Sequence, residues 1–309
     1  MQLIKPDINI NFVGKRKIAA IFSVLVILAG IASLIIKGGP NYGVDFAGGT
    51  LVQTQFAEAT DAATIKEALA PLNLGAMVVQ QFGEEANEFL IRTQESDSAL
   101  KGLSQNMLIE LEKQYGTGQV EIRRTEMVGP QVGKDLREKG LMALLYAMIG
   151  ILIYISWRFE FRFAVGAITA LIHDVLITFG AFSVFNKEID LPIIAAFLAI
   201  IGYSLNDTII VYDRIRENRS KHGRDGFPAI INRSINETLS RTILTSGTTL
   251  LVVAALFIFG GGVIHNFAFA LLVGILVGTY SSVYVASPVL LLGNKEEDKT
   301  ANSLEGSQA

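Results

Sequence analysis

Six long apolar runs dominate this 309-residue sequence. Crossing a hydrocarbon core about 30 Å thick takes about 20 residues of helix, because each residue rises 1.5 Å. Backbone polar groups in lipid must be satisfied within their own segment, so runs of this length are predicted to be helical. The runs are residues 18–36, 140–157, 163–185, 191–212, 242–259 and 263–292. The sequence therefore predicts a polytopic α-helical membrane protein with six transmembrane helices.

The first and last runs differ from the other four. The first is too long for the apolar part of a cleaved signal peptide and lacks a clear small-residue cleavage site, so we predict a signal-anchor. The last is longer than one crossing needs, and we predict that it begins with a loop around His265.

Composition adds few constraints. Half of the residues are hydrophobic, 18% are charged and the net charge is −3, which gives no indication of a nucleic-acid partner. The chain has no cysteine, which excludes disulfides and thiolate metal sites.

Basic residues in the short flanks of the runs predict the orientation. They gather before the first run, after the second and in a connector at 214–240, and they are nearly absent from the opposite flanks. They are Lys5, Lys15, Arg16, Lys17, Arg158, Arg162, Arg214, Arg216, Arg219, Lys221, Arg224, Arg233 and Arg241. The termini, residues 1–17 and 293–309, are therefore expected in the cytoplasm, and the polar C-terminal tail is predicted to be disordered.

The segment 37–139 has the composition of a folded domain and is expected on the outer side of the membrane. Alternating apolar residues and turn signals predict four strands, and helical periodicity predicts two helices. The strands are 51–56, 77–82, 88–93 and 120–128, with a turn at 83–87, and the helices lie near 60–70 and 100–115. The order βαββαβ is typical of a ferredoxin-like α+β sandwich. The segment has no His or Cys, so a binding or spacer module is favoured over an enzyme.

A glycine-rich stretch at 43–50 precedes the first strand. A phosphate-binding loop would need a Lys-Ser/Thr ending and a following helix, and both are missing. A tight turn from the membrane into the strand is favoured, with Asp45 as a cap of that turn. The residues of this motif are Gly43, Asp45, Phe46, Gly48, Gly49 and Thr50.

Ionisable residues inside the runs are candidate functional sites, because a charge costs about 2.5–3.5 kcal/mol at the centre of a membrane helix. Asp207 lies sixteen residues after Leu191, about 24 Å along the fourth run. Arg241 begins the fifth run at a similar depth, where it either contacts Asp207 or extends to lipid headgroups. Asp213 is interpreted as an exposed anchor at the membrane surface.

Secondary polar candidates surround this pair. Asn206 adjoins Asp207, and Thr245 lies one turn after Arg241. His173 and Asp174 in the third run either join a relay or are satisfied by neighbouring hydroxyl and backbone groups, and the second interpretation is slightly favoured.

Small residues recur every four positions in the sixth run, which predicts tight helix packing. They are Ala270, Gly274, Gly278, Ser282 and Ala286. Many transporters bind their substrate between two related halves, but this sequence contains no internal repeat. A related half on another chain is therefore expected.

The motifs together resemble those of the SecF family of protein-export membrane subunits, which is related to the resistance-nodulation-division exporters. The resemblance lies in Gly-Val-Asp-Phe-Ala-Gly-Gly-Thr at 43–50, His-Asp-Val at 173–175, Gly-Tyr-Ser-Leu-Asn-Asp-Thr at 202–208 with Val-Tyr-Asp-Arg-Ile-Arg-Glu-Asn at 211–218, and Ser-Ile-Asn to Ser-Arg-Thr at 234–242. These stretches cover most of the predicted membrane part.

The resemblance implies an accessory subunit of the Sec translocase in the bacterial inner membrane rather than an enzyme. It implies pairing with SecD, association with the SecYEG channel and YajC, an indirect link to SecA, and secretory polypeptides as substrates. It also implies that Asp207 is the titrating carboxylate of a proton relay, that Arg241 is its cationic partner, and that no cofactor is needed beyond a coupling ion, H⁺ or alternatively Na⁺. Two alternatives are half of a small-molecule or lipid exporter and a membrane scaffold in which Asp207 is structural.

Overall fold

The computed structural model describes every residue except 1–7, 76, 83–85, 94–101, 223 and 294–309. The predictions made for Lys5, for residues 83–85 of the turn and for the C-terminal tail lie outside the described residues.

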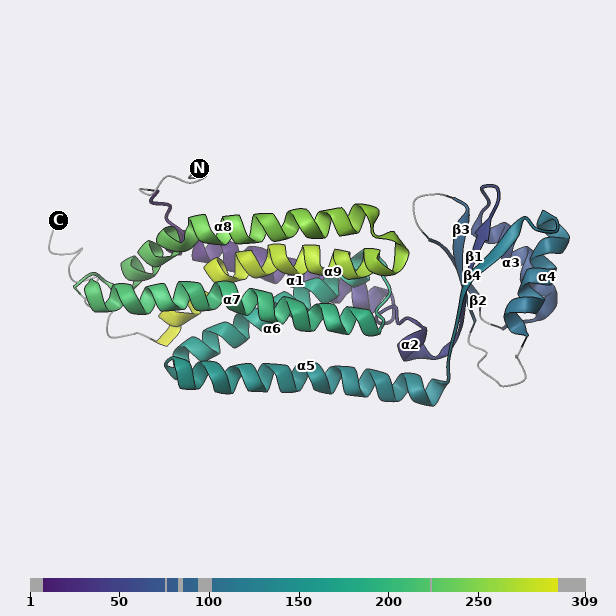
Figure 1. Ribbon diagram of the computed structural model, residues 1–309. Coiled ribbons are helices and arrows are strands. Elements are labelled where there is room, and N and C mark those ends of the chain that lie inside the picture. Colours follow the sequence, from purple (N-terminus) through teal and green to yellow (C-terminus); the bar gives the residue numbers. More distant parts are fainter. Residues whose placement is uncertain (1–7, 76, 83–85, 94–101, 223, 294–309) are drawn as a thin grey trace.

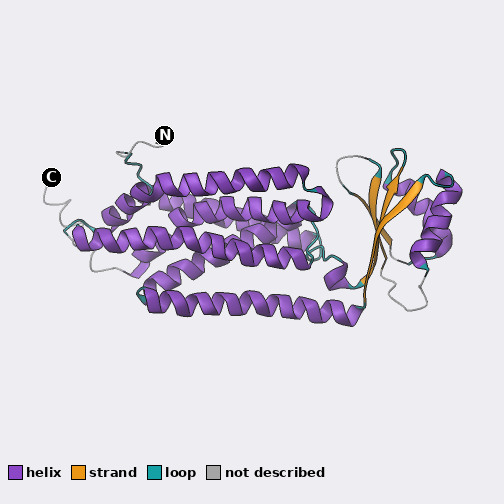
Figure 2. Cartoon of the chain, in the orientation of Figure 1, coloured by secondary structure: helices purple, strands orange, loops and turns teal. Residues whose placement is uncertain are grey.

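Within the described chain, six helices are long and apolar enough to cross a membrane, which confirms the predicted fold class. They are α1 (Arg16–Ile36), α5 (Pro130–Arg158), α6 (Phe161–Val184), α7 (Leu191–Lys221), α8 (Phe227–Phe259) and α9 (Gly261–Ser281), which continues to residue 293. The helices run side by side as an elongated bundle (Figures 1 and 2). The ends of the described chain, residues 8 and 293, lie at one end of the bundle, and the sheet domain lies beyond the other (Figure 1).

Helix occupies nearly all of the predicted connector at 214–240. Helix α7 continues to Lys221 and α8 already begins at Phe227, so the link between them is only residues 222–226. Charged pairs along one helix stabilise these polar extensions, as in the contact of 2.6 Å between Lys221 and Glu217. Asn218 of α7 also donates a hydrogen bond of 3.0 Å to Ser234 of α8.

The predicted loop at His265 is wrong, because this residue lies inside α9. Its ring stacks on that of Phe257 with centroids 4.0 Å apart, and its Nδ1 lies 2.9 Å from the Phe257 carbonyl oxygen. The sixth run is overlong because a π-helical turn (Ser282–Ala286), the short α10 (Ser287–Val289) and a 3-10 turn (Leu290–Gly293) extend it.

The sheet domain lies between the first two spanning helices and has the ferredoxin-like arrangement. Its strands are β1 (Gly49–Phe56), β2 (Met77–Gln81), β3 (Glu88–Thr93) and β4 (Val120–Val128), and its helices are α3 (Ala62–Leu69) and α4 (Leu103–Tyr115). The antiparallel sheet has the order β2-β3-β1-β4. The two helices cover one face (Figure 2), where fully buried Val52, Ile91 and Met107 form part of the core.

Residues 41–50, which include the glycine-rich stretch, form the neck between α1 and the sheet. A one-turn helix, α2 (Val44–Ala47), is followed by Gly48 and Gly49 with φ of 75° and 116°, a left-handed conformation that glycine adopts without strain. A Cβ on Gly48 would lie 2.8 Å from the Cα of Pro130, so the neck passes very close to the start of α5. The predicted tight turn is thus a helical turn followed by two glycines.

The small-residue stripe of the sixth run lies where α9 crosses α7. A Cβ on Gly278 would lie 2.9 Å from the Cβ of Ser204, and a Cβ on Gly274 would collide with Ile200. Ser282 lies in the π-helical turn, and its hydroxyl donates a hydrogen bond of 3.0 Å to the carbonyl of Thr279. The stripe therefore allows the two backbones to approach closely.

A methyl group at position 278 should destabilise this crossing. We expect Gly278→Ala to lower the free energy of unfolding by about 1–3 kcal/mol, because a filled contact forces a backbone shift. Thermal unfolding of the purified protein in detergent measures the effect. Gly150→Ala is the control, because no heavy atom lies within 4 Å of its added Cβ. Equal melting temperatures for the two variants would contradict close packing at Gly278.

Candidate functional site

Asp207 lies fully buried inside the bundle, in a helix that begins sixteen residues earlier. Its Oδ2 accepts one hydrogen bond, of 3.3 Å, from the hydroxyl of Ser246 on α8. Its Oδ1 has no hydrogen-bond partner among the described residues. A buried carboxylate is costly unless hydrogen bonds or an opposite charge compensate it, so the charge of Asp207 is poorly compensated in this arrangement.

The hydroxyl beside Asp207 belongs to a short polar chain between helices. Ser246 also lies 2.8 Å from the hydroxyl of Thr279 on α9, whose other hydrogen bond goes to its own helix backbone. Sequence reasoning selected Thr245 instead, but its hydroxyl donates to the carbonyls of Arg241 and Thr242. Ser246 lies one helical turn after buried Thr242, but in the sequence nothing distinguishes it from the other hydroxyl residues of this run.

Arg241 is exposed and makes no ion pair with a described carboxylate within 4.0 Å. The structure therefore does not bring Arg241 and Asp207 into direct contact. Asn206 is exposed as well, and Gly202 lies exposed one turn before it. A polar strip on α7 and α8 thus faces outward from the bundle.

His173 and Asp174 form a second polar centre in which every carboxylate oxygen is bonded. The Asp174 Oδ1 lies 2.9 Å from His173 Nδ1, and its Oδ2 accepts hydrogen bonds of 2.5 Å from Ser204 and 2.8 Å from Ser281. The Nε2 of His173 lies 3.0 Å from the hydroxyl of Ser23. These residues come from four helices, and nothing in the sequence indicates that the three serines converge.

The two buried aspartates therefore differ in how well their charge is compensated. Asp174 has two hydrogen bonds from serines and a histidine partner, which fits the interpretation that neighbouring groups satisfy it. Asp207 has a single long hydrogen bond. Of the two, Asp207 is better suited to gain and lose a proton. In the described part of the chain, no group of three or more His, Cys, Asp or Glu side chains is arranged to hold a metal ion.

This difference predicts opposite effects on stability. Asp174→Asn should lower the free energy of unfolding by about 1–3 kcal/mol, because an amide leaves buried donors unmatched. Asp207→Asn should leave stability unchanged or raise it, because it removes a buried charge that few groups compensate. Thermal unfolding of each variant in detergent at pH 7 tests this. Equal losses in both variants would mean that Asp207 is as firmly bonded as Asp174.

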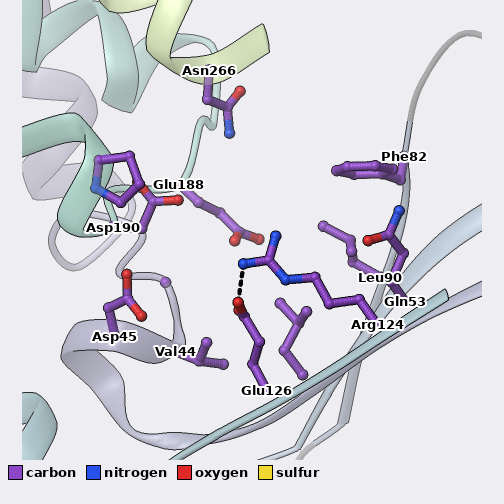
Figure 3. Close-up of a pocket in the computed structure, with 13 residues that line it drawn as sticks. Val44, Asp45, Gln53, Phe82, Leu90, Arg124, Glu126, Glu188, Asp190 and Asn266 are labelled. Carbon is purple, nitrogen blue, oxygen red and sulfur yellow. Dashed lines mark hydrogen bonds and ion pairs between the residues drawn. The ribbon is translucent and has the colours of Figure 1, made fainter. Parts of the chain in front are cut away.

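The domain end of α7 carries a separate set of charged residues. The prediction that Asp45 caps its own turn is wrong. Its carboxylate instead accepts a hydrogen bond of 2.9 Å from the backbone N–H of Leu191, the first residue of α7. Asp190 caps the same helix through the N–H of Ile193. Both carboxylates line a small cavity of about 90 Å³ together with Glu126, Glu188 and Arg124 (Figure 3).

The carboxyl of Asp190 has a shifted pKa. Burial raises the pKa to about 6, and the nearby negative charges of Asp45 and Glu188 add to the shift, while the hydrogen bond from Ile193 opposes it. The ordinary value is 3.8, so the folded state binds this proton more tightly than the unfolded chain. The protonated Asp190 carboxyl therefore contributes to the free energy of unfolding at acidic pH, and this contribution is lost as the pH rises through about 6.

The remaining motif residues position this end of the bundle. The backbone N–H of Gly43 donates a hydrogen bond of 2.9 Å to the carbonyl of Ile189. Phe46 is buried among Phe182, Ile189 and other apolar side chains of α6 and α7. Thr50 lies in β1, where it pairs with Thr93 and Met127 of the neighbouring strands.

Known proteins are similar to this chain in sequence and in fold. Residues 108–296 match the family described as protein export membrane protein SecD/SecF, C-terminal, and residues 33–60 match the SecD/SecF GG motif. This chain belongs to the SecD/SecF family of protein-export membrane proteins. The resemblance to SecF is confirmed by a protein translocase subunit SecF from Magnetococcus marinus, which is 50% identical over 94% of both chains. Another from Vibrio alginolyticus is 49% identical over 96% of this chain and 94% of its own.

Solved structures of SecDF share the fold of this SecF-family chain. The SecDF crystal structure from Thermus thermophilus is 35% identical and matches 95% of the chain with a TM-score of 0.85. A structure of SecDF in a super-membrane-facing form matches the whole chain with a TM-score of 0.69. The chain spans only about two fifths of these proteins, 40% and 41% of their lengths.

Proposed function

We infer that this chain is an accessory subunit of the Sec protein translocase and that it couples an ion gradient to protein export through Asp207. Its relatives are named protein translocase subunit SecF, in agreement with a role that is not enzymatic. The observation that carries the coupling proposal is the buried Asp207 carboxylate. One of its oxygens accepts a hydrogen bond of 3.3 Å, and the other has no hydrogen-bond partner among the described residues. The better bonded Asp174 offers no comparable proton-binding group.

The coupling ion in this proposal is H⁺ rather than Na⁺. Hard metal cations in proteins take several oxygen ligands, whereas a proton needs one carboxylate oxygen. Asp207 is bonded to one hydroxyl among the described residues, which suits a proton. One charge moved through 100 mV supplies about 2.3 kcal/mol, or about a 50-fold change in an equilibrium between two states.

Arg241 completes the relay in this proposal. A charged Asp207 attracts the guanidinium, and a protonated Asp207 releases it, so each proton changes the packing of α7 against α8. The exposed strip at Gly202, Asn206 and Arg241 is the surface that a second half of the machine would cover.

We propose SecD as that second half, because the SecDF proteins contain a matching portion within a much longer chain. Association with the SecYEG channel and YajC, indirect cooperation with SecA, and action on secretory polypeptides are parts of the same proposal. The chain would lie in the bacterial inner membrane with both termini in the cytoplasm. This orientation agrees with the basic flanks and with the position of both described ends opposite the sheet domain (Figure 1).

Asp207→Asn should abolish the gradient-dependent part of export, because an amide cannot bind and release a proton. Membrane vesicles with the variant and its partners measure export with and without an imposed proton gradient. Asp213→Asn is the matched control. Asp213 lies on the same helix, but its side chain is half-exposed and forms an ion pair of 3.5 Å with Arg158. Full gradient-dependent export with Asp207→Asn would contradict the proposed coupling and favour a structural Asp207.

Arg241→Met should reduce gradient-dependent export about as much as Asp207→Asn, because both remove the charge switch. Arg233→Met is the control, because this exposed arginine lies on the same helix and pairs only with surface carboxylates. The comparison uses the same vesicle assay and equal amounts of assembled protein. Unchanged export with Arg241→Met would assign this residue to anchoring at the membrane surface.

A further inference from the structure

The sheet domain and the bundle are joined by a buried ion pair. Arg92 on β3 pairs with Glu188, which lies in the loop between α6 and α7, and the two side chains are only 14% and 11% exposed. The Nη1 of Arg92 also donates a hydrogen bond of 3.2 Å to the carbonyl of Tyr42 in the neck. Among the ion pairs of the described residues, this is the one that links the sheet to the helix bundle.

Backbone hydrogen bonds fix the same loop to the neck. Tyr42 and Ile189 form a parallel β-bridge, in which the N–H of Gly43 donates to Ile189 at 2.9 Å and the N–H of Ile189 donates to Asn41 at 2.8 Å. Two residues later, the N–H of Leu191 donates to Asp45 of α2. The segment 188–191 is thus bonded to the neck and to the sheet. We name it, with Arg92 and residues 41–45, the joint.

The joint leads directly into the helix that carries the proposed proton site. Helix α7 is unbroken from Leu191 to Lys221, and Asp207 lies about 24 Å from its start. A continuous helix is a rigid element, so a displacement of α7 near Asp207 also moves its first residue. That first residue is hydrogen-bonded to the neck.

We propose that the joint is a rigid link through which the movement of α7 is transmitted to the sheet domain, with Arg92 and Glu188 as its positioning residues. This inference rests on the proposed coupling at Asp207. The chain also joins the sheet to the bundle covalently, through the neck and through the junction of β4 with α5 (Figure 1). The ion pair of Arg92 with Glu188 adds a non-covalent contact between β3 and the loop that leads into α7.

Breaking the ion pair should uncouple the domain from the bundle. Glu188→Gln and Arg92→Gln should each reduce gradient-dependent export about tenfold or more, because the remaining buried charge loses its partner. The exchanged pair, Arg92→Glu with Glu188→Arg, should recover part of the loss. Arg123→Gln is the matched control, since its contact of 3.6 Å with Glu121 is an exposed pair on β4 of the same sheet. Wild-type export in both single variants would overturn the proposal.

A disulfide across the joint tests whether the joint opens during the cycle. The chain has no cysteine, so Tyr42→Cys with Ile189→Cys can form a single bridge, and bridged strands lie about 4.8 Å apart, within reach of a disulfide. With Arg92 and Glu188 intact, oxidation should leave export unchanged. Inhibition there would show that the joint opens during the cycle, and would overturn the rigid link.

A direct measurement separates failure of the joint from failure of the proton coupling. Spin labels at exposed Lys113 of the sheet domain and exposed Val184 of α6 report the distance between domain and bundle. We expect this distance to differ between the wild type and Asp207→Asn, and the difference to disappear when Glu188→Gln is added. Retention of the difference in the Glu188→Gln background refutes the joint alone. Loss of export in the joint variants with full export in Asp207→Asn refutes the coupling at Asp207 alone.

Discussion

The cost of burying charge among lipid-spanning helices is the constraint on which this structure depends. Two aspartates are buried in the bundle, and they differ in the number of hydrogen bonds that compensate their charge. Asp174 is held by His173 and two serines, and His173 also contacts Ser23, so four helices are tied together around a compensated charge. Asp207 has one long hydrogen bond, and this leaves a group whose charge can change. Small residues at the crossing of α7 and α9 make both arrangements possible, because they bring the helix backbones close enough for hydroxyl groups to bridge them.

The sheet domain meets the bundle at a polar junction. Its core is apolar, and Arg124 and Glu126 of β4 line the cavity beside Asp190 (Figure 3). There the neck, the sheet and the start of α7 are bonded to one another through residues 188–191. The polar strip on α7 and α8 lies on another surface of the bundle, where a partner half would bind. The two surfaces meet in α7, which carries Asp207 between them.

The sequence predicted the number of helices and the strand order well, because hydrophobic length and alternation are local signals. It did not indicate that the connector at 214–240 is helical, since a polar helix lacks the apolar signal. It also misplaced the cap formed by Asp45, whose partner Leu191 is 146 residues away in the chain. Among site residues, Asp207 was recognisable from its rarity inside an apolar run, whereas Ser246 was hidden among many other hydroxyl residues of the fifth run.

By itself the sequence determined that this protein spans a membrane six times, that a ferredoxin-like domain interrupts the spans, and that Asp207 and Asp174 are buried charges that need an explanation. These follow from the length of apolar runs and from the cost of charge in lipid, which do not depend on how the helices pack. Only the tertiary structure decided which aspartate is compensated, that Arg241 lies apart from Asp207, and that Arg92 reaches Glu188. Hydrogen bonds and ion pairs act over about 3–4 Å, and the partners of each are brought within that distance only by folding.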